Sequence, residues 1–184
     1  MSIKIIKGLM KGRYLKTISR SESNTRPILA RVKKSLFDII KGIVQESNFV
    51  DLFAGIGTVG LEALSCSAKH VTFVELNYKL IKYIKRNINT LNFSAQSSII
   101  RCDLLNNFQI LKNNKFDIIF LDPPYNGNFT YITLRNILQY KIVKKSSLII
   151  SKRYIKEVVN NIQDLIRIKM LQYGDTAIIF YRVK

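Results

Sequence analysis

The sequence is poor in the residues that build disulfide frameworks and metal sites. Its 184 residues include two cysteines, Cys66 and Cys102, and one histidine, His70. Two thiols give no disulfide framework, and with a single imidazole they do not complete a zinc site of ordinary spacing. We therefore expect reduced thiols and no bound metal.

Long apolar runs are missing as well. No run reaches the ~18 residues that a membrane span requires, and the start, Met1-Ser2-Ile3-Lys4, lacks the apolar stretch of a signal peptide. We therefore expect a cytoplasmic protein without a membrane partner. The hydrophobic fraction of 47% and the mean hydropathy of +0.06 exclude a disordered chain and predict a folded core.

Acidic residues are scarce. Thirty Lys and Arg face 12 Asp and Glu, and the net charge of +18 suggests a polyanionic partner. Residues 1–37 alone hold ten basic side chains and one acid, Glu22. Compositional drift toward Lys codons in an A+T-rich genome is the alternative explanation. Drift alone would not concentrate half of the net charge in a fifth of the chain, so we expect a basic N-terminal surface.

The first 47 residues have the pattern of a basic N-terminal extension. Residues 3–8 and 12–15 resemble two short strands with glycine-containing turns. Thr25-Arg26-Pro27 is typical of a helix start, because proline is tolerated in the first turn. Apolar residues then recur at helical spacing to about Gly42, which predicts an amphipathic helix with a basic side.

Strand and helix patterns alternate over residues 48–184. The predicted strands are Phe49–Phe53, Val71–Glu75, Ser98–Arg101, Phe116–Leu121, Leu148–Ser151, Leu165–Gln172 and Ala177–Val183, and the predicted helices lie near 58–66, 77–91, 104–112 and 129–139. Such alternation predicts an α/β fold with a parallel sheet covered by helices on both faces. The last two strands are joined by a short turn, so they must be antiparallel neighbours.

A glycine-rich loop follows the first strand of this region. Gly55, Gly57 and Gly60 form a G-x-G-x-x-G pattern between strand and helix, and Glu75 ends the next strand 20 residues after Gly55. This spacing is typical of a site for an adenosine ribose, whose hydroxyls Glu75 would bind. NAD and S-adenosylmethionine share that ribose. Asp51, just before the glycines, would repel a pyrophosphate but suits a ligand with an ammonium and a sulfonium.

A second motif, Asp122-Pro123-Pro124-Tyr125, follows the fourth strand. An exocyclic amine of a nucleobase is a poor nucleophile, and oxygen acceptors aimed at its hydrogens stabilise the positive charge that develops on nitrogen. Asp122 would supply a carboxylate, Pro123 a carbonyl, and the two prolines would restrict the backbone. Tyr125 offers a ring on which an extruded base can stack.

Together these motifs resemble the class I S-adenosylmethionine-dependent amino methyltransferases over residues 48–184. Finer matches make the chain similar to the bacterial 16S rRNA guanine-N2 methyltransferases, the RsmD family. These matches are Gly8, Lys11-Gly12-Arg13, Leu15, Arg26-Pro27, Arg31-Val32, Leu36-Phe37, Asp51 to Ser65, Tyr173 to Thr176 and Tyr181. The chain departs from the family at Ile56, where Ser is usual, and at Lys7, where Gly is usual.

The resemblance implies a class I (Rossmann-like) methyltransferase fold and a set of site residues. The implied cofactor contacts are Asp51, Phe53, Gly55, Gly57, Gly60, Glu75, Leu76, Asp103 and Leu104, with Asp103 near the adenine amine. The implied catalytic loop is Asp122, Pro123, Pro124 and Tyr125, and the expected RNA contacts are Lys11, Arg13, Arg26, Arg31, Lys33 and Lys34. Glu62, in the predicted helix near residues 58–66, is expected to be solvated or to cap that helix.

We therefore expect a monomeric enzyme that methylates the N2 amine of a guanosine in 16S rRNA, within a small-subunit assembly particle. Methylation of adenine N6 or cytosine N4 in DNA or RNA is the nearest alternative, although only residues 1–47 are available for target recognition. A nicotinamide oxidoreductase is disfavoured by Asp51 and by Asp122 to Tyr125. A non-catalytic RNA-binding module is disfavoured because both motifs are intact.

Overall fold

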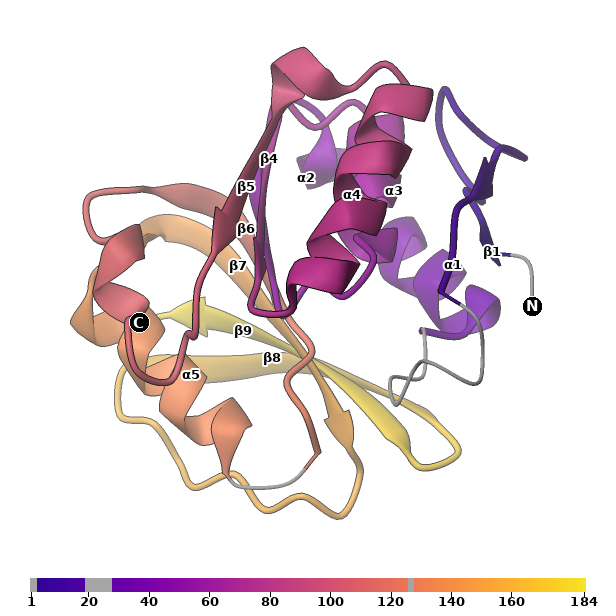
Figure 1. Ribbon diagram of the computed structural model, residues 1–184. Coiled ribbons are helices and arrows are strands. Elements are labelled where there is room, and N and C mark those ends of the chain that lie inside the picture. The colour runs from indigo at the N-terminus through magenta and orange to yellow at the C-terminus, as the bar shows by residue number, and fades with distance from the viewer. Residues whose placement is uncertain (1–2, 19–27, 126–127) are drawn as a thin grey trace. The chain divides into compact units, whose positions relative to one another are not determined.

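The computed structural model describes residues 3–18, 28–125 and 128–184 (Figure 1). The chain divides into two compact units, Met1–Arg101 and Cys102–Lys184. Within the described residues, no helix is long and apolar enough to cross a membrane. The predicted functional boundary between residues 47 and 48 lies inside the first unit and stays a prediction.

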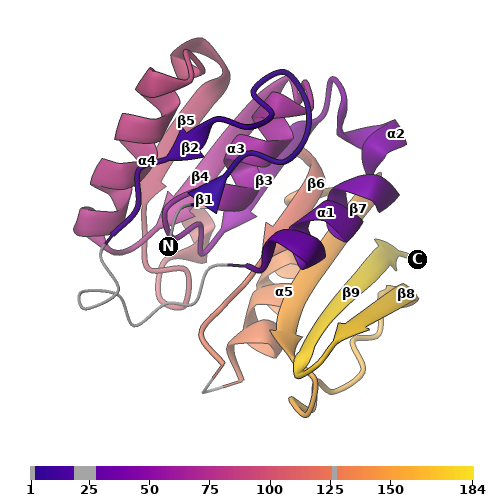
Figure 2. The ribbon, with the colours of Figure 1, turned by 90° about the vertical axis from the view of Figure 1, so that its right-hand side faces the viewer.

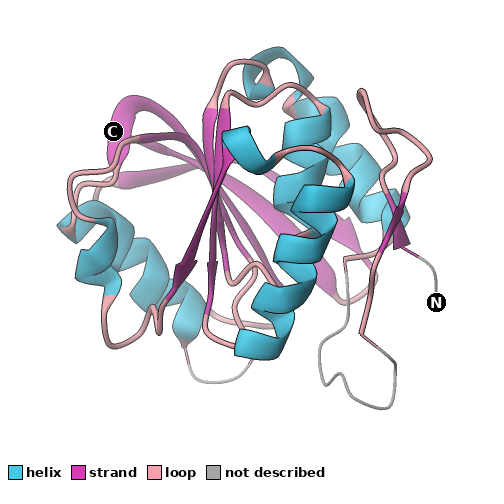
Figure 3. Ribbon diagram, turned by 45° about the horizontal axis from the view of Figure 1, so that its top comes forward, coloured by secondary structure: helices cyan, strands magenta, loops and turns pink. Residues whose placement is uncertain are grey.

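Three parallel strands form the framework of the first unit: β3 (Asn48–Leu52), β4 (His70–Glu75) and β5 (Ser97–Arg101). Helix α3 (Thr58–Ser65) packs on β3 and β4, and α4 (Tyr78–Thr90) packs on β4 and β5 (Figure 3). The Asn77 side chain caps α4 by accepting a hydrogen bond from the Lys79 amide. Its short polar side chain satisfies one of the amides that a helix start leaves unpaired.

The N-terminal segment packs on this unit through a strand pair, β1 (Ile3–Lys4) and β2 (Tyr14–Leu15), and through α1 (Ala30–Ile39) and α2 (Lys41–Val44). In Figure 2 the strand pair lies over α3. Gly8, with φ +73°, lies so close to the end of α3 that a Cβ there would be 1.8 Å from the Ser65 carbonyl oxygen. Only glycine allows this contact.

The second unit holds β6 (Phe116–Leu121), β7 (Val143–Tyr154), β8 (Leu165–Tyr173) and β9 (Thr176–Val183). β6 and β7 are parallel, whereas β9 runs antiparallel to both β7 and β8. Helix α5 (Phe129–Gln139) packs against β7. The crossover helix allows the parallel pair, while the short turn between β8 and β9 produces the hairpin.

Within the first unit the strand order is β5-β4-β3, and within the second unit it is β6-β7-β9-β8. The predicted fold class, a mostly parallel sheet that ends in an antiparallel hairpin, is confirmed. One predicted element is wrong: residues 104–112 form turns and the short 3₁₀ helix η3 (Phe108–Leu111) instead of an α-helix. Asp103 causes the difference, because its carboxylate accepts from the Leu105 amide and so favours a turn. The predicted helix start at 25–27 lies outside the described residues.

Candidate active site

The glycine-rich loop joins β3 to α3 in the first unit, and two carboxylates hold its backbone. The Asp51 Oδ2 accepts from the Gly60 amide at 2.9 Å, and the Glu75 Oε2 accepts from the Gly55 amide at 2.8 Å. The second oxygen of Glu75 accepts from the Asn77 amide at 2.8 Å. The predicted loop residues are therefore brought together, with Glu75 from the neighbouring strand beside them.

The glycines of this loop meet two different requirements. Gly60 lies against β4, where an added Cβ would be 2.3 Å from a ring carbon of Phe73. Gly55, in contrast, has φ +60° and faces open space, since an added Cβ would meet no described atom within 4 Å. The loop thus packs tightly against its own sheet on one side and leaves room for a ligand at Gly55.

Phe53, another predicted cofactor contact, has an unusual backbone conformation. Its φ is 63°, in the left-handed region that bulky side chains rarely adopt. Residues held in such conformations cluster at functional sites, where the surrounding structure maintains the strain. The strain lies at the end of β3, where the chain turns into the glycine loop.

The remaining predicted cofactor contacts lie after β4 and β5. Leu76 is exposed beside Glu75, whereas the Leu104 side chain is buried. Asp103 is half-buried, and its Oδ2 accepts from the Asn106 side-chain amide at 2.7 Å. Asp103 and Leu104 belong to the second unit, as do Asp122 and its neighbours.

The Asp122–Tyr125 loop leaves the end of β6. Pro123 is buried, Pro124 is exposed, and the Tyr125 side chain is 46% exposed. The predicted acceptor and the predicted stacking ring therefore occupy one short loop, with the ring open to the surface. The Tyr154 ring from the end of β7 lies 6.5 Å from the Tyr125 ring, centroid to centroid.

Sequence reasoning missed the residue that contacts this loop most closely, Lys152. Its Nζ donates to both Asp122 oxygens, at 2.7 and 2.8 Å, and to the Tyr125 hydroxyl at 2.9 Å. Burial raises the pKa of the Asp122 carboxyl, and the Lys152 ammonium opposes that shift. Burial acts to lower the pKa of Lys152, but Asp122 and Tyr125 together raise it above its usual value. The available signal was a lysine directly after the apolar run Leu148–Ser151.

Most of the predicted RNA contacts lie on the surface of the first unit. Lys11, Arg13, Arg31 and Lys34 are exposed, and Arg26 lies outside the described residues. Lys34 makes an ion pair of 3.1 Å with Asp38, one turn along α1. These exposed side chains remain candidate RNA contacts.

The prediction that Lys33 contacts RNA is wrong. It is 2% exposed, and its Nζ lies 2.6 Å from the Glu62 Oε2. Glu62, which was expected to be solvated or to cap its helix, is completely buried and also accepts from the Ile6 and Lys7 amides at 2.9 and 2.5 Å. Lys33 therefore holds the N-terminal segment against α3 and does not face a phosphate.

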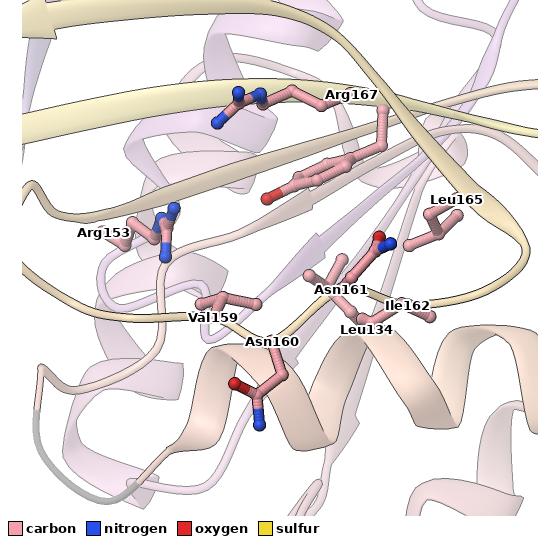
Figure 4. A pocket seen from close by; sticks show the side chains of 9 residues that line it. Leu134, Arg153, Val159, Asn160, Asn161, Ile162, Leu165 and Arg167 are labelled. Carbon is pink, nitrogen blue, oxygen red and sulfur yellow. The ribbon is translucent and has the colours of Figure 1, made fainter.

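A cavity of about 310 Å³ lies elsewhere in the second unit (Figure 4). Figure 4 shows Arg153 and Arg167 on one side of it and Leu134 of α5 on another. Arg153 donates to the Glu157 carbonyl at 2.5 Å. None of the described residues predicted for the site lines this cavity, so it is separate from the Asp122–Tyr125 loop.

The fold, the glycine loop with its two carboxylates and the Asp-Pro-Pro-Tyr loop define a class I methyltransferase. The family model described as "Conserved hypothetical protein 95" matches residues 3–182. The chain therefore belongs to this family, the RsmD family, as the sequence resemblance predicted.

Curated relatives agree with this membership. A protein of Bacillus subtilis named putative rRNA methyltransferase YlbH is 31% identical over 183 residues, which cover 98% of each chain. The ribosomal RNA small subunit methyltransferase D of Haemophilus influenzae is 35% identical over 149 residues, which cover 80% of this chain and 76% of the relative.

Solved structures give the same fold. A putative methyltransferase from Escherichia coli superposes with a TM-score of 0.89 at 23% identity, covering 100% of this chain and 99% of the other. A putative methylase from Haemophilus influenzae superposes with a TM-score of 0.81 at 29% identity, with the same coverage.

Proposed function

We propose that this protein transfers the methyl group of S-adenosylmethionine to the exocyclic N2 amine of a guanosine in 16S ribosomal RNA. The observation that carries the proposal is the Asp122–Tyr125 loop. The carboxylate of Asp122 and the exposed aromatic ring of Tyr125 stand three residues apart at the end of a buried parallel strand. This pairing suits a flipped base that presents an N–H-bearing nitrogen.

The residues of the glycine loop fit the proposed cofactor. Open space lies at Gly55, and the carboxylate of Glu75 lies at its amide. Glu75 would hold the ribose hydroxyls, Asp51 would favour the cationic methionine end, and Asp103 would accept from the adenine amine. When bound, S-adenosylmethionine supplies an electrophilic methyl carbon on a sulfonium.

Each part of the catalytic loop has a separate role in this proposal. The Asp122 carboxylate accepts a hydrogen of the target amine and stabilises the positive charge that develops on nitrogen. The Pro123 carbonyl accepts the other hydrogen, and Tyr125 stacks on the base. Much of the rate enhancement would come from holding the amine in line with the methyl group.

The choice of guanine N2 rests on the family. Adenine N6, cytosine N4 and guanine N2 all present two hydrogens to Asp122 and Pro123, so the loop alone does not rank them. The Haemophilus influenzae relative is named as a small-subunit rRNA enzyme, which supports 16S rRNA as the substrate, and we propose a small-subunit assembly particle as its setting.

Transfer of a labelled methyl group tests the proposal. The protein is incubated with labelled S-adenosylmethionine and either free 16S rRNA or small ribosomal subunits, and the RNA is digested to nucleosides. We expect N2-methylguanosine, and we expect it to form roughly 10²–10³ times more slowly with Asp122→Ala. Label in N6-methyladenosine or N4-methylcytidine would contradict the choice of base, and no label in either substrate would contradict the activity.

A further inference from the structure

Lys152 belongs to none of the predicted sets of site residues, yet its place in the sheet directs it to the catalytic loop. In the β6–β7 pairing Ser151 is opposite Leu121, the last residue of β6, so Lys152 is level with Asp122. On the other side, Lys152 pairs with Ile178 of β9. Because β7 is held by a strand on each side, the backbone that carries this lysine is fixed.

The ammonium of Lys152 has three N–H donors, and the loop supplies three acceptors. These are the two Asp122 oxygens, at 2.7 and 2.8 Å, and the Tyr125 hydroxyl, at 2.9 Å. The ammonium also lies 5.1 Å from the centre of the Tyr125 ring, within cation–π range. Lys152 is 5% exposed, so these contacts are shielded from solvent and are stronger than surface pairs.

The two ends of the loop are thereby joined through one side chain. Asp122 begins the loop and Tyr125 ends it, and the Lys152 ammonium donates a hydrogen bond to each of them. A carboxylate has about four lone-pair positions, so two accepted bonds leave room for a further donor. The Asp122 oxygens can thus receive a target amine while Lys152 holds them in place.

We propose that Lys152 is a positioning residue, whose ammonium holds the Asp122 carboxylate and the Tyr125 ring in the single arrangement that receives the target amine. The inference rests on the proposed function of the loop. It adds a residue from β7 to a site that the sequence confined to residues 122–125.

The charge of Lys152 gives this role a measurable pH dependence. Among the described residues, Lys152 of β7 donates to Asp122 and to the Tyr125 hydroxyl, and the Tyr154 ring of β7 lies against the Tyr125 ring. The Lys152 ammonium lowers the pKa of Asp122 against the effect of burial. If the ionised carboxylate is the active form, removing Lys152 raises that pKa and moves the acid limb of the pH–rate profile to higher pH.

The test compares Lys152→Met and Lys152→Arg with a matched control. Lys144→Met removes another lysine of β7 that pairs with a β6 carboxylate, Asp117, at 2.6 Å, but at the far end of the strand. We expect Lys152→Met to lower kcat by about 10²-fold at neutral pH, the scale of a misplaced catalytic group. We expect Lys152→Arg to recover most of this loss and Lys144→Met to match the natural chain.

Two further measurements separate positioning from damage to the fold. Affinity for S-adenosylhomocysteine, measured by calorimetry, should stay unchanged in Lys152→Met. The acid limb of the pH–rate profile of this variant should move to higher pH. Should Lys152→Met fail to fold, Lys152→Gln provides the same loss of charge with a hydrogen-bond donor retained, and the same shift is expected.

Asp122→Ala distinguishes this inference from the proposed function. If Asp122→Ala keeps a kcat within a few-fold of the natural enzyme, the proposed function of the loop is wrong. If Asp122→Ala is slowed as expected but the Lys152 variants match Lys144→Met in kcat and in the acid limb of the pH–rate profile, only the role of Lys152 is overturned. A Lys152→Met enzyme that is faster than the natural one would also overturn it, because the ammonium would then obstruct the amine.

Discussion

The buried pair of Lys33 and Glu62 makes the stability of the N-terminal segment testable. The side chains are 2% and 0% exposed, their charged atoms lie 2.6 Å apart, and Glu62 also holds the Ile6 and Lys7 amides. Removing one partner leaves an uncompensated buried charge, which costs about 3–5 kcal/mol. We therefore expect Lys33→Met to lower the free energy of unfolding by about that amount.

This loss is a large fraction of the ~5–15 kcal/mol that stabilises a typical protein. For a chain of this size, ~1 kcal/mol shifts Tm by ~2–4 °C, so we expect Tm to fall by roughly 6–20 °C. Urea denaturation followed by circular dichroism measures the change as a lower midpoint at an unchanged slope.

The double variant Lys33→Met with Glu62→Gln sharpens the test. Both charges are then absent, and the glutamine oxygen can still accept from the Ile6 and Lys7 amides. We expect the double variant to recover most of the stability lost by Lys33→Met, which would appear as a favourable coupling energy. Lys34→Met, which removes an exposed pair on the same helix, should leave the midpoint nearly unchanged. Equal, small losses in Lys33→Met and Lys34→Met would refute the reasoning.

Three further predictions concern the proposed activity. Glu75→Ala should weaken S-adenosylhomocysteine binding by ~1–3 kcal/mol, the scale of hydrogen bonds to a charged group, in calorimetry; comparable binding of NAD to the natural chain would contradict the cofactor. Asp122→Ala should lower kcat by roughly 10²–10³ with little change in cofactor affinity, and a rate within a few-fold of the natural enzyme would exclude the proposed role. The double variant Lys11→Gln with Arg13→Gln should weaken RNA binding and reduce its log–log salt slope by roughly 1–2, whereas an unchanged slope would place the RNA surface elsewhere.

Local patterns predicted most of the fold. The predicted bounds of β6 and α5 match those observed, and the predicted strands before and after them agree within a few residues, except β7. β7 extends beyond the predicted Leu148–Ser151 at both ends, because Val143 pairs with Phe116 of β6 and because β9 pairs with β7 as far as Tyr154. Pairing with a distant strand is not visible in a local pattern.

The errors in the site have the same origin. Lys33 appeared to lie on a basic helix face because its partner, Glu62, comes 29 residues later and meets it only in the folded chain. Lys152 lay just after the predicted strand Leu148–Ser151 and received no role, and its contact with Asp122 arises only because β7 aligns with β6. The motifs themselves were predictable because each is continuous in sequence. The charged partners of these residues were not predictable, because the partners meet only through tertiary contacts.

The central claim is that the Asp122–Tyr125 loop directs methyl transfer to guanine N2. Inosine is guanosine without that amine, so it offers Asp122 and the Pro123 carbonyl no exocyclic hydrogens at this position. The direct measurement is therefore labelled methyl transfer to a 16S rRNA substrate with inosine at the modified position, beside the matched guanosine substrate. We predict similar RNA binding and no methyl transfer to inosine, and a methylated inosine base would contradict the claim.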